Sequence, residues 1–424
     1  MKQTDSRNTG TIIISLILLC MAGILSVAAK YVNGFAEWYS VNIYSLITGT
    51  AGRLTGAVPF SVAEAAVCVL PLIFIVDIVR CRRRLRKVLS HILLIVSVLF
   101  FLYAANCGVN YHRNMFVDRE ALSEAEFSEE QLADFCEYII SRLEDCGTET
   151  GYPHGRELAD EARASMNKLS ENHPSLGGYY PVPKQLAVLS GAFSAMGVSG
   201  IYSPFTVEAN INGEMPDMEK PFTACHELSH LRGYMNEGEA NYIGWLACIG
   251  SDDPSFNRSG WLIGWIYAGG ALRRTDPGRY DILSKRLPSY AVSEISDNDL
   301  FWASHETKAS EVQDRVNDAY LKANDQKDGI QSYGMLTTLM LMYYCDHDSP
   351  YGHHHNDEIL FRMCMKHLNM VKVLSENFDP RLSGKISRLR GSLFFHIGQS
   401  RPDNRRNLWT RARALYSKLP RGSQ

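Results

Sequence analysis

The chain has 424 residues, a formal net charge of −3 at pH 7 and ten cysteines. It is long enough for more than one domain, and a charge so close to neutral gives no indication of a nucleic-acid partner. No two cysteines have the C-x-x-C spacing, which argues against a cysteine zinc ribbon and against thioredoxin chemistry.

Three apolar runs near the N-terminus predict a membrane anchor within residues 1–107, and the lipid bilayer is therefore the first expected partner. Each run is close to the ~20 residues that a spanning helix needs. The predicted helices cover about residues 11–30, 61–79 and 88–106. Val27-Ala28-Ala29 resembles the cleavage site of a signal peptide, but the two later runs favour an uncleaved anchor.

A basic cluster, RCRRRLRK at residues 80–87, lies between the second and third apolar runs. Basic loops remain on the cytoplasmic side of a membrane, so we expect this loop inside the cell. Residues 31–57, with aromatic side chains suited to a membrane interface, are then expected as a loop outside. Everything after about residue 107 would also lie outside, as the main domain of a multi-pass plasma-membrane protein.

The first half of the expected outer domain changes from a helical to a strand pattern. Apolar spacing predicts helices at 128–145 and 157–169, and Cys136 and Cys146 could pair in an oxidising compartment. Residues 182–212 indicate strands and turns. A peptide substrate could add to the strand near 201–211, where Glu208 and Asn210 are candidate substrate contacts. Outward-facing polar side chains of a strand are the alternative interpretation for both.

The most informative stretch is PFTACHELSHLRGYMNEGEANYIGWLAC, residues 221–248. It contains His226, Glu227 and His230 in the spacing H-E-x-x-H. Residues four apart share one face of a helix, so the two histidines can hold one metal ion. Glu227 could then take a proton from a water on that metal, as in zinc hydrolases. A chance occurrence on an ordinary amphipathic helix is the alternative.

Three side chains compete for the third ligand position after His230. Gly233 is a natural stop for the first helix, and Asn236 has the character of an N-cap with Glu239 as its capping-box partner. This leaves Glu237 as the favoured zinc ligand, with Glu239 and Asn236 as alternatives.

The rest of the second helix also matters to the predicted site. Asn241 lies four residues after Glu237 and is expected to support a ligand through a hydrogen bond, with Glu239 close by.

The remainder of the chain predicts helices at 259–273, 308–325 and 331–344, the first as a buried core helix and the last packed under the site. Tyr320, Tyr333 and His305 are candidates for stabilising an oxyanion, and Tyr333 also for contacting substrate; structural roles are the alternative for each.

Two further features lie beyond these helices. The triplet His353-His354-His355 is expected to be solvated rather than metal-binding. The basic tail, residues 361–424, is expected to be helical or partly disordered, or to lie against anionic head groups.

Several phrases of the chain together resemble a known family. They are YSVNIYSLI with PFS, SGIYSPFTVEANIN, HELSHLRGYMNEGEAN and VNDAYLKANDQKDGIQSYG. Over roughly residues 10–345 the chain resembles the bacterial membrane proteins grouped as domain of unknown function 3810. That group is similar to the thermolysin-like zincin metallopeptidases, in which a ligand Glu is followed four residues later by a supporting Asp or Asn. The resemblance implies a membrane-anchored, zincin-like envelope protein and no particular substrate.

The sequence thus predicts a mainly α protein with a small β-sheet. An α+β zincin-like domain at 108–360 would follow the three spanning helices and hold one Zn²⁺ through His226, His230 and Glu237. The expected activity is cleavage of a peptide or protein substrate outside the cytoplasm, with Glu227 as the base. A metal-holding scaffold without activity and a zinc amidase acting on a non-peptide envelope substrate are the alternatives.

Overall fold

A computed structural model provides the structure of the chain. Residues Met1–Tyr344 form one compact unit. The structure describes residues 2–82, 84–117, 122, 127–147, 151–324 and 332–347. The histidine triplet at 353–355 and the basic tail lie outside the described residues, so the expectations for them stay predictions.

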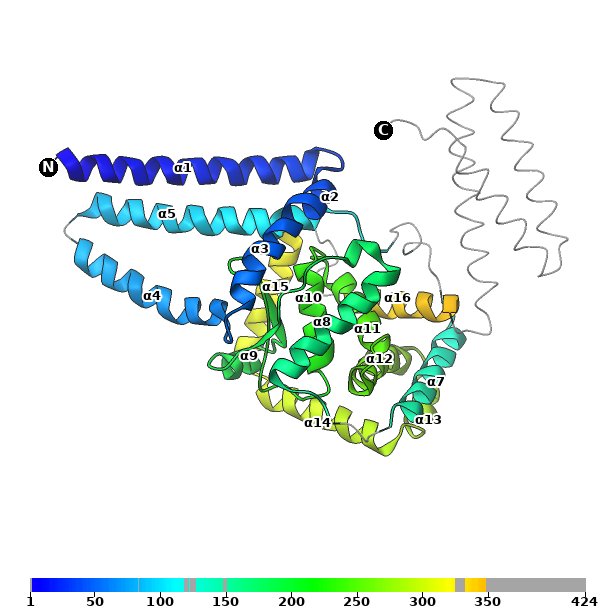
Figure 1. The fold of residues 1–424 in the computed structure, drawn as a ribbon. Helices are drawn as coiled ribbons and strands as arrows, with labels where there is room; N and C mark the ends of the chain where they lie inside the picture. The colour runs from blue at the N-terminus through cyan, green and yellow to red at the C-terminus, as the bar shows by residue number, and fades with distance from the viewer. Residues whose placement is uncertain are drawn as a thin grey trace, which may run out of the picture. The chain divides into compact units, whose positions relative to one another are not determined.

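The three predicted apolar helices are present. They are α1 (Lys2–Tyr31), α4 (Val62–Cys81) and α5 (Leu85–Tyr103), and α5 runs on through η2 (Ala104–Gly108) and η3 (Val109–His112). Asn8–Tyr31, Val62–Cys81 and Leu85–His112 are long and apolar enough to cross a membrane. The N-terminal ends of α1 and α5 and the C-terminal end of α4 lie far from the rest of the unit (Figure 1). The helical path thus continues past residue 107, where we expected the anchor to end.

Residues 31–57 are helical, whereas the sequence predicted a loop there. They form α2 (Phe35–Tyr39), η1 (Ser40–Tyr44) and α3 (Ser45–Gly56). Glu37 forms an ion pair with Arg113, Nη2 to Oε1 3.0 Å. The hydroxyl of Tyr44 lies 2.8 Å from that of Tyr202. These partners are distant in sequence, which is why local patterns could not indicate how this segment packs.

The described residues contain a three-stranded sheet. Its strands are β1 (Lys184–Gln185), β2 (Gly200–Ser203) and β3 (Glu208–Ile211), in the order β1-β3-β2. β1 pairs with β3 in parallel and β2 pairs with β3 antiparallel. The single strand expected near 201–211 is wrong: a turn at 204–207 divides it into β2 and β3, and a short helix α9 (Ser190–Ala195) lies between β1 and β2. β2 is an edge strand beside the helix that carries the H-E-x-x-H motif.

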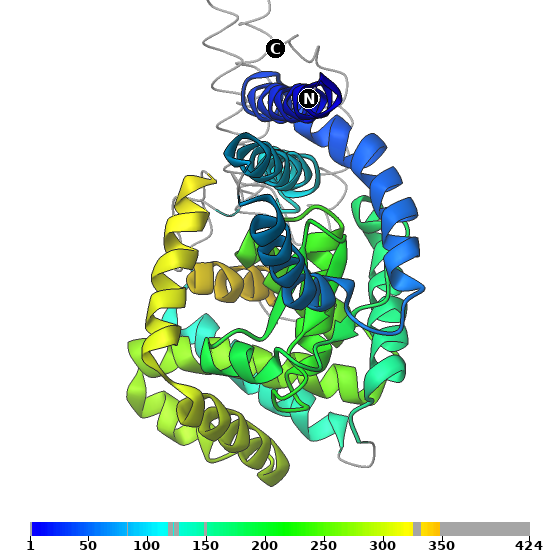
Figure 2. The ribbon, with the colours of Figure 1, turned by 90° about the vertical axis from the view of Figure 1, so that its left-hand side faces the viewer.

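Helices make up the rest of the fold, so the chain is mainly α with a small sheet, as predicted. They are α7 (Glu129–Cys146), α8 (Gly155–Asn172), η4 (Pro174–Leu176), α10 (Lys220–Leu231), α11 (Glu237–Ile249), α12 (Pro254–Thr275), α13 (Pro277–Ser284), α14 (Ser289–His305), α15 (Lys308–Ala323) and α16 (Ser332–His347). Figure 2 looks along the spanning helices, with α3 and α15 on either side of them.

The core centres on α11 and α12, where the ring of Trp245 meets that of Trp261 edge-on at 5.7 Å. α12 is buried within this core, as the sequence predicted. Cys136 and Cys146, which the sequence allowed as a pair, are both free thiols. They lie ten residues apart on α7, about 15 Å along the axis and beyond the reach of a disulfide.

Candidate metal centre

The loop between α10 and α11 returns the chain so that the two helices pack closely. Gly233 ends α10 with a φ of 88°, which a side chain rarely adopts. Asn236 caps α11, its side chain accepting from the backbone N–H of Glu239 at 3.0 Å. A Cβ at Gly244 would lie only 3.0 Å from the backbone nitrogen of His226, so glycine allows the close approach. These local features confirm the helix boundaries predicted around the motif.

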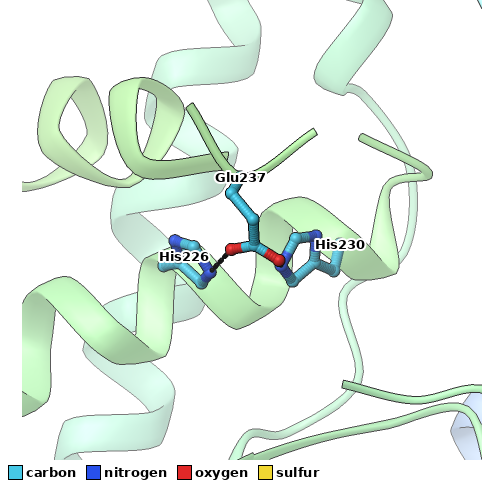
Figure 3. A group of neighbouring side chains, drawn as sticks. All are labelled: His226, His230 and Glu237. Atoms are coloured by element: carbon cyan, nitrogen blue, oxygen red, sulfur yellow. Dashed lines mark ion pairs between the residues drawn. The ribbon is translucent and has the colours of Figure 1, made fainter. Parts of the chain in front are cut away.

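This packing brings His226, His230 and Glu237 together (Figure 3). The Nε2 of His226 lies 3.4 Å from Oε2 of Glu237, and the Nε2 of His230 lies 3.7 Å from Oε1. All three ligand atoms are within 4.8 Å of one another, and within the described residues this is the one His/Cys/Asp/Glu group so arranged. Zinc bonds of about 2.1 Å in a tetrahedral site would separate two ligand atoms by about 3.4 Å.

Hydrogen bonding also prepares His230 to act as a ligand. Its Nδ1 lies 2.7 Å from the carbonyl oxygen of Tyr234. An N–H on Nδ1 that donates to this oxygen leaves the Nε2 lone pair directed at Glu237. The Nδ1 of His226 is buried with no partner among the described residues. The residues therefore fit a single zinc ion with two imidazoles and one carboxylate.

The charges of the three side chains reinforce one another. Burial disfavours the charged form of His230, but the Glu237 carboxylate outweighs it and raises the pKa of His230 to about 9. Burial likewise disfavours charge on Glu237, yet the two imidazoles hold the pKa of that carboxyl well below its usual range. The pocket thus keeps Glu237 ionised, as a metal ligand must be, and binding of an ion there would release the proton that Glu237 favours on His230.

Glu227 lies beside this group in a different environment. Its side chain is 3 % exposed, and Oε2 has no partner among the described residues. Burial raises the pKa of Glu227 to about 7, although the neighbouring imidazoles lower it and Glu237 raises it further. A carboxyl with a pKa near neutrality is suited to accepting and returning a proton.

The edge strand β2 passes directly against Glu227. A Cβ at Gly200 would lie 2.5 Å from Oε1 of Glu227 and 2.8 Å from Cγ2 of Thr223. Glycine is therefore required where the strand crosses α10. No local pattern predicted this contact, because Gly200 and Glu227 belong to separate elements that meet only in the fold.

The remaining residues predicted on α11 and α16 take different positions. The carboxylate of Glu239 accepts hydrogen bonds from the backbone N–H groups of Phe116 and Val117, and so ties the segment after η3 to α11. Asn241 lies one turn after Glu237 and is 8 % exposed.

α16 packs near the site as expected, because a Cβ at Gly238 would meet the sulfur of Met335 at 2.6 Å. The side chain of Tyr333 is outside the described residues.

Glu208 and Asn210, predicted as substrate contacts, are not brought to the metal ligands. Glu208 is 1 % exposed and pairs with Lys184, Nζ to Oε1 2.7 Å. Asn210 is fully buried two residues further along β3. Alternation along the strands places both on the sheet face opposite the one that Gly200 presents to α10. The sequence pattern identified β3 as a strand. It did not indicate that α4 covers the face of β3 that carries Glu208.

Two of the oxyanion candidates are described. His305 bonds within its own helix, with Nδ1 2.8 Å from the carbonyl oxygen of Phe301. The hydroxyl of Tyr320 lies 3.5 Å from Sγ of Cys107, in a cluster that also contains the ring of Tyr111. Tyr320 is therefore the candidate that the structure places near the site.

The end of the third spanning helix forms one wall of the site, which sequence reasoning missed. The carboxylate of Glu237 is close enough to the Cys107 thiol and to Tyr111 to interact with them electrostatically. On another side the ring of Tyr202 lies 6.5 Å from that of His230. The candidate metal centre thus lies beside the C-terminal end of α5.

Fold and site together define a chain with three apolar helices and an α+β body that carries a His-His-Glu centre. A family model described as protein of unknown function (DUF3810) matches residues 39–341, most of the chain, which therefore belongs to this family. No curated protein and no solved structure matches the chain. The family predicted from the sequence phrases is confirmed, and its similarity to the zincins stays a prediction.

Proposed function

We propose that this protein is a membrane-anchored zinc hydrolase, a metallopeptidase that cleaves peptide bonds outside the cytoplasm. The observation that carries the proposal is the group of His226, His230 and Glu237, with the buried Glu227 carboxyl beside it. A metal site that only stabilised the fold would need the three ligands but not an adjacent carboxyl with one oxygen left without a protein partner. This feature favours an enzyme over a scaffold.

Each side chain has a distinct role in the proposed reaction. His226, His230 and Glu237 would hold the ion, which supplies a polarised carbonyl and a water of lowered pKa when bound. Glu227 takes the proton of the attacking water on its free oxygen and passes it to the leaving amine. Burial raises the pKa of Glu227 and so helps the carboxyl hold the proton between the two transfers.

The edge strand supplies a way to hold an extended peptide. Ile201 lies opposite Asn210 and Tyr202 opposite Ala209 in the antiparallel pair. The N–H of Asn212 donates to the carbonyl of Ser199. Hydrogen-bonded positions alternate along an antiparallel pair, so Ile201 and Ser203 are the next residues of this chain segment to bond to β3. The backbone groups of Gly200 and Tyr202 therefore point away from β3, where a substrate strand could pair with them.

The substitution Glu227→Gln tests the assigned base. Glutamine has nearly the same shape but cannot accept the proton, and loss of a general base costs roughly 10²–10⁴-fold in rate. We expect zinc to remain bound while cleavage of a mixed peptide library by the full-length protein falls by that factor. Glu157→Gln, at an exposed position of α8, is the control. Full activity of the Glu227 variant would rule out this mechanism.

We also propose that the site lies outside the cytoplasm of a bacterial cell. The Arg80–Lys87 cluster and the N-terminus lie at the end of the spanning helices away from the body (Figure 1). Basic loops stay on the cytoplasmic side, so the body would face the opposite side.

A further inference from the structure

An apolar cavity of about 810 Å³ lies between the spanning helices and the turn that follows β2. α1, α3 and α5 form most of its wall, and Phe205, Thr206 and Val207 of the β2–β3 turn close it. Side chains at its rim are well exposed, with Leu54 at 75 %, Ile24 at 62 % and Phe205 at 46 %. The cavity is therefore open, and α1 and α5, two of the helices that line it, are apolar enough to cross a membrane.

The turn that closes this cavity is strained. Val207 has a φ of 55°, and among the described residues it is the one non-glycine with positive φ. A β-branched residue in this conformation costs on the order of 1–2 kcal/mol, and such strain gathers at functional sites. Val207 is also 2 % exposed, so the surrounding structure holds it against the cavity.

The metal centre lies at the level of the outer membrane surface. Cys107 beside Glu237 is 19 residues after Val88, the start of the apolar part of α5. At 1.5 Å per residue this is about 29 Å, close to the ~30 Å thickness of the hydrocarbon core. Phe101 and Ala105 line the cavity up to two turns before Cys107. The cavity is thus at the depth of the outer acyl chains, and the site is just above it.

The edge strand β2 runs from the candidate metal centre to the apolar cavity. Gly200 at its start lies against Glu227, and Phe205, two residues after its end, lines the cavity. Four or five extended residues of a bound peptide, at about 3.3 Å each, would cover this distance. Tyr202 and Asn106 separate site and cavity inside the protein, joined by a 3.0 Å hydrogen bond from the tyrosine hydroxyl to the Asn106 carbonyl. A substrate would therefore reach both by lying along the outer edge of β2.

The chemistry of the cavity selects its occupant. A polypeptide backbone there would leave polar groups unpaired among apolar side chains, which is costly, whereas an acyl chain has none. A spanning helix about 30 Å long and 10 Å wide fills roughly 2,000 Å³, far more than this cavity holds. Antiparallel pairing is the commoner arrangement, and on β2 it would direct the N-terminal side of a substrate towards the cavity.

We infer that the substrate is a peptide with an acyl chain on its N-terminal side. The cavity between α1, α3 and α5 holds this acyl chain, while Glu227 takes part in cleaving a peptide bond about five residues further along the substrate. This inference rests on the proposed function, since it names the substrate class of the same site. The cavity adds a second point of attachment, which raises the effective concentration of the peptide at β2.

The test uses zinc-loaded full-length protein in nanodiscs and one pool of decapeptides in three forms. The first form is unacylated, the second is myristoylated at the N-terminus, and the third is myristoylated on a C-terminal lysine. Each myristoyl chain contains a diazirine, so that photolabelled residues can be identified. Both acylated forms concentrate equally at the membrane, and any difference between them therefore reports the orientation of the bound peptide.

We expect the N-terminally acylated form to be cleaved at least about tenfold faster than the C-terminally acylated form, with labelling at Met21, Leu54 or Phe205. Ala51→Trp, which fills the cavity from α3, should abolish both the difference and the labelling. Leu46→Trp, an exposed position on the same helix outside the cavity, should change neither. Leu54→Asn makes the cavity mouth polar and repeats the test in case the larger side chain prevents folding.

Equal cleavage of the two acylated forms, with labelling outside the cavity, would overturn the inference and leave the proposed function intact. If the zinc-loaded protein cleaves none of the three forms, the proposed function fails. The labelling then still decides whether the cavity takes the acyl chain, because it does not depend on cleavage.

Discussion

Gly200 is the residue that most constrains the position of the proposed base. The absence of a side chain lets β2 lie against Glu227, where a Cβ would come within 2.5 Å of Oε1. Thr223 at 2.8 Å and the Cγ of Glu227 at 2.9 Å close the space from the other directions. Any side chain at this position must therefore move the carboxyl or the strand.

Gly200→Ala should keep zinc and lose most activity. The added methyl displaces the Glu227 carboxyl, and misplacing a catalytic group by about 1 Å can cost on the order of 10²-fold in rate. Zinc content and the rate of peptide cleavage, measured on the same sample, test this. Ile201→Ala is the control, since this side chain is 47 % exposed on the other face of the strand. Unchanged activity of the Gly200 variant would mean that Glu227 is not positioned by β2.

At the residue scale, the sequence predicted what local chemistry determines. The N-cap at Asn236, the stop at Gly233 and the shared helix face of His226 and His230 all follow from spacing within one stretch of chain. The roles of Gly200, Tyr202 and Cys107 around the site depend on contacts between distant segments. No periodicity or turn rule contains that information.

Among the elements, α4 and the sheet are joined by two carboxylates that point in opposite directions. Glu208 on β3 accepts from the backbone N–H groups of Val62 and Ala63, at 3.1 and 2.8 Å, in the first turn of α4. Glu64 on α4 accepts from the N–H groups of Ala187, Val188 and Leu189 beyond β1. Negative charge at the start of a helix is favourable, so Glu208 also stabilises α4.

Glu208→Ala should destabilise the protein strongly. It leaves the Lys184 ammonium buried without its carboxylate, and breaking a buried ion pair in this way costs about 3–5 kcal/mol. The carbonyls of Thr55 and Phe60, which accept from Lys184 Nζ at 2.6 and 2.8 Å, offset part of this cost.

The measurement is the free energy of unfolding in detergent, with Glu171→Ala at an exposed position of α8 as the control. Lys184→Met combined with Glu208→Leu should recover much of the loss, because no charge is then left unpaired. A loss below about 0.5 kcal/mol in the single variant would show that the pair is not needed to hold the sheet on α4.

The elements show where prediction succeeded and failed. α7, α8, α12 and α15 were predicted within a few residues, since amphipathic or apolar patterns and caps are local. Residues 31–57 were expected as a loop because their apolar positions suit an interface as well as a core. Their helices are fixed by partners on other elements, Arg113 and Tyr202 among them. Strands and turns at 182–212 were recognised, but not the helix α9 between β1 and β2 or the turn that divides 201–211 into two strands.

On the scale of the whole molecule, the apolar helices are part of the body that carries the candidate metal centre. The C-terminal end of α5 forms a wall of that centre, and Arg113 just beyond it donates to the carbonyl of Arg232 at the end of α10, 2.7 Å away. A fragment that begins near residue 108 would lack Cys107 and the helices that cover the sheet. Experiments on the site therefore need the full-length chain.

The orientation of the molecule can be tested with truncated fusions. A reporter that is active only outside the cytoplasm should be active when fused after residue 117 and inactive when fused after residue 85. The reason is the basic cluster at 80–87, which stays on the cytoplasmic side. The reverse pattern would place the metal centre in the cytoplasm and contradict the proposed location.

The central claim is that His226, His230 and Glu237 hold one zinc ion, and zinc stoichiometry of the purified full-length protein tests it most directly. We predict one zinc per chain in the wild type and none in Glu237→Ala. Glu239→Ala should keep its zinc and lose about 1–3 kcal/mol of stability, since the N–H groups of Phe116 and Val117 lose their acceptor. A wild type that binds no zinc when zinc is in excess, or loss of zinc in the Glu239 variant alone, would contradict this assignment.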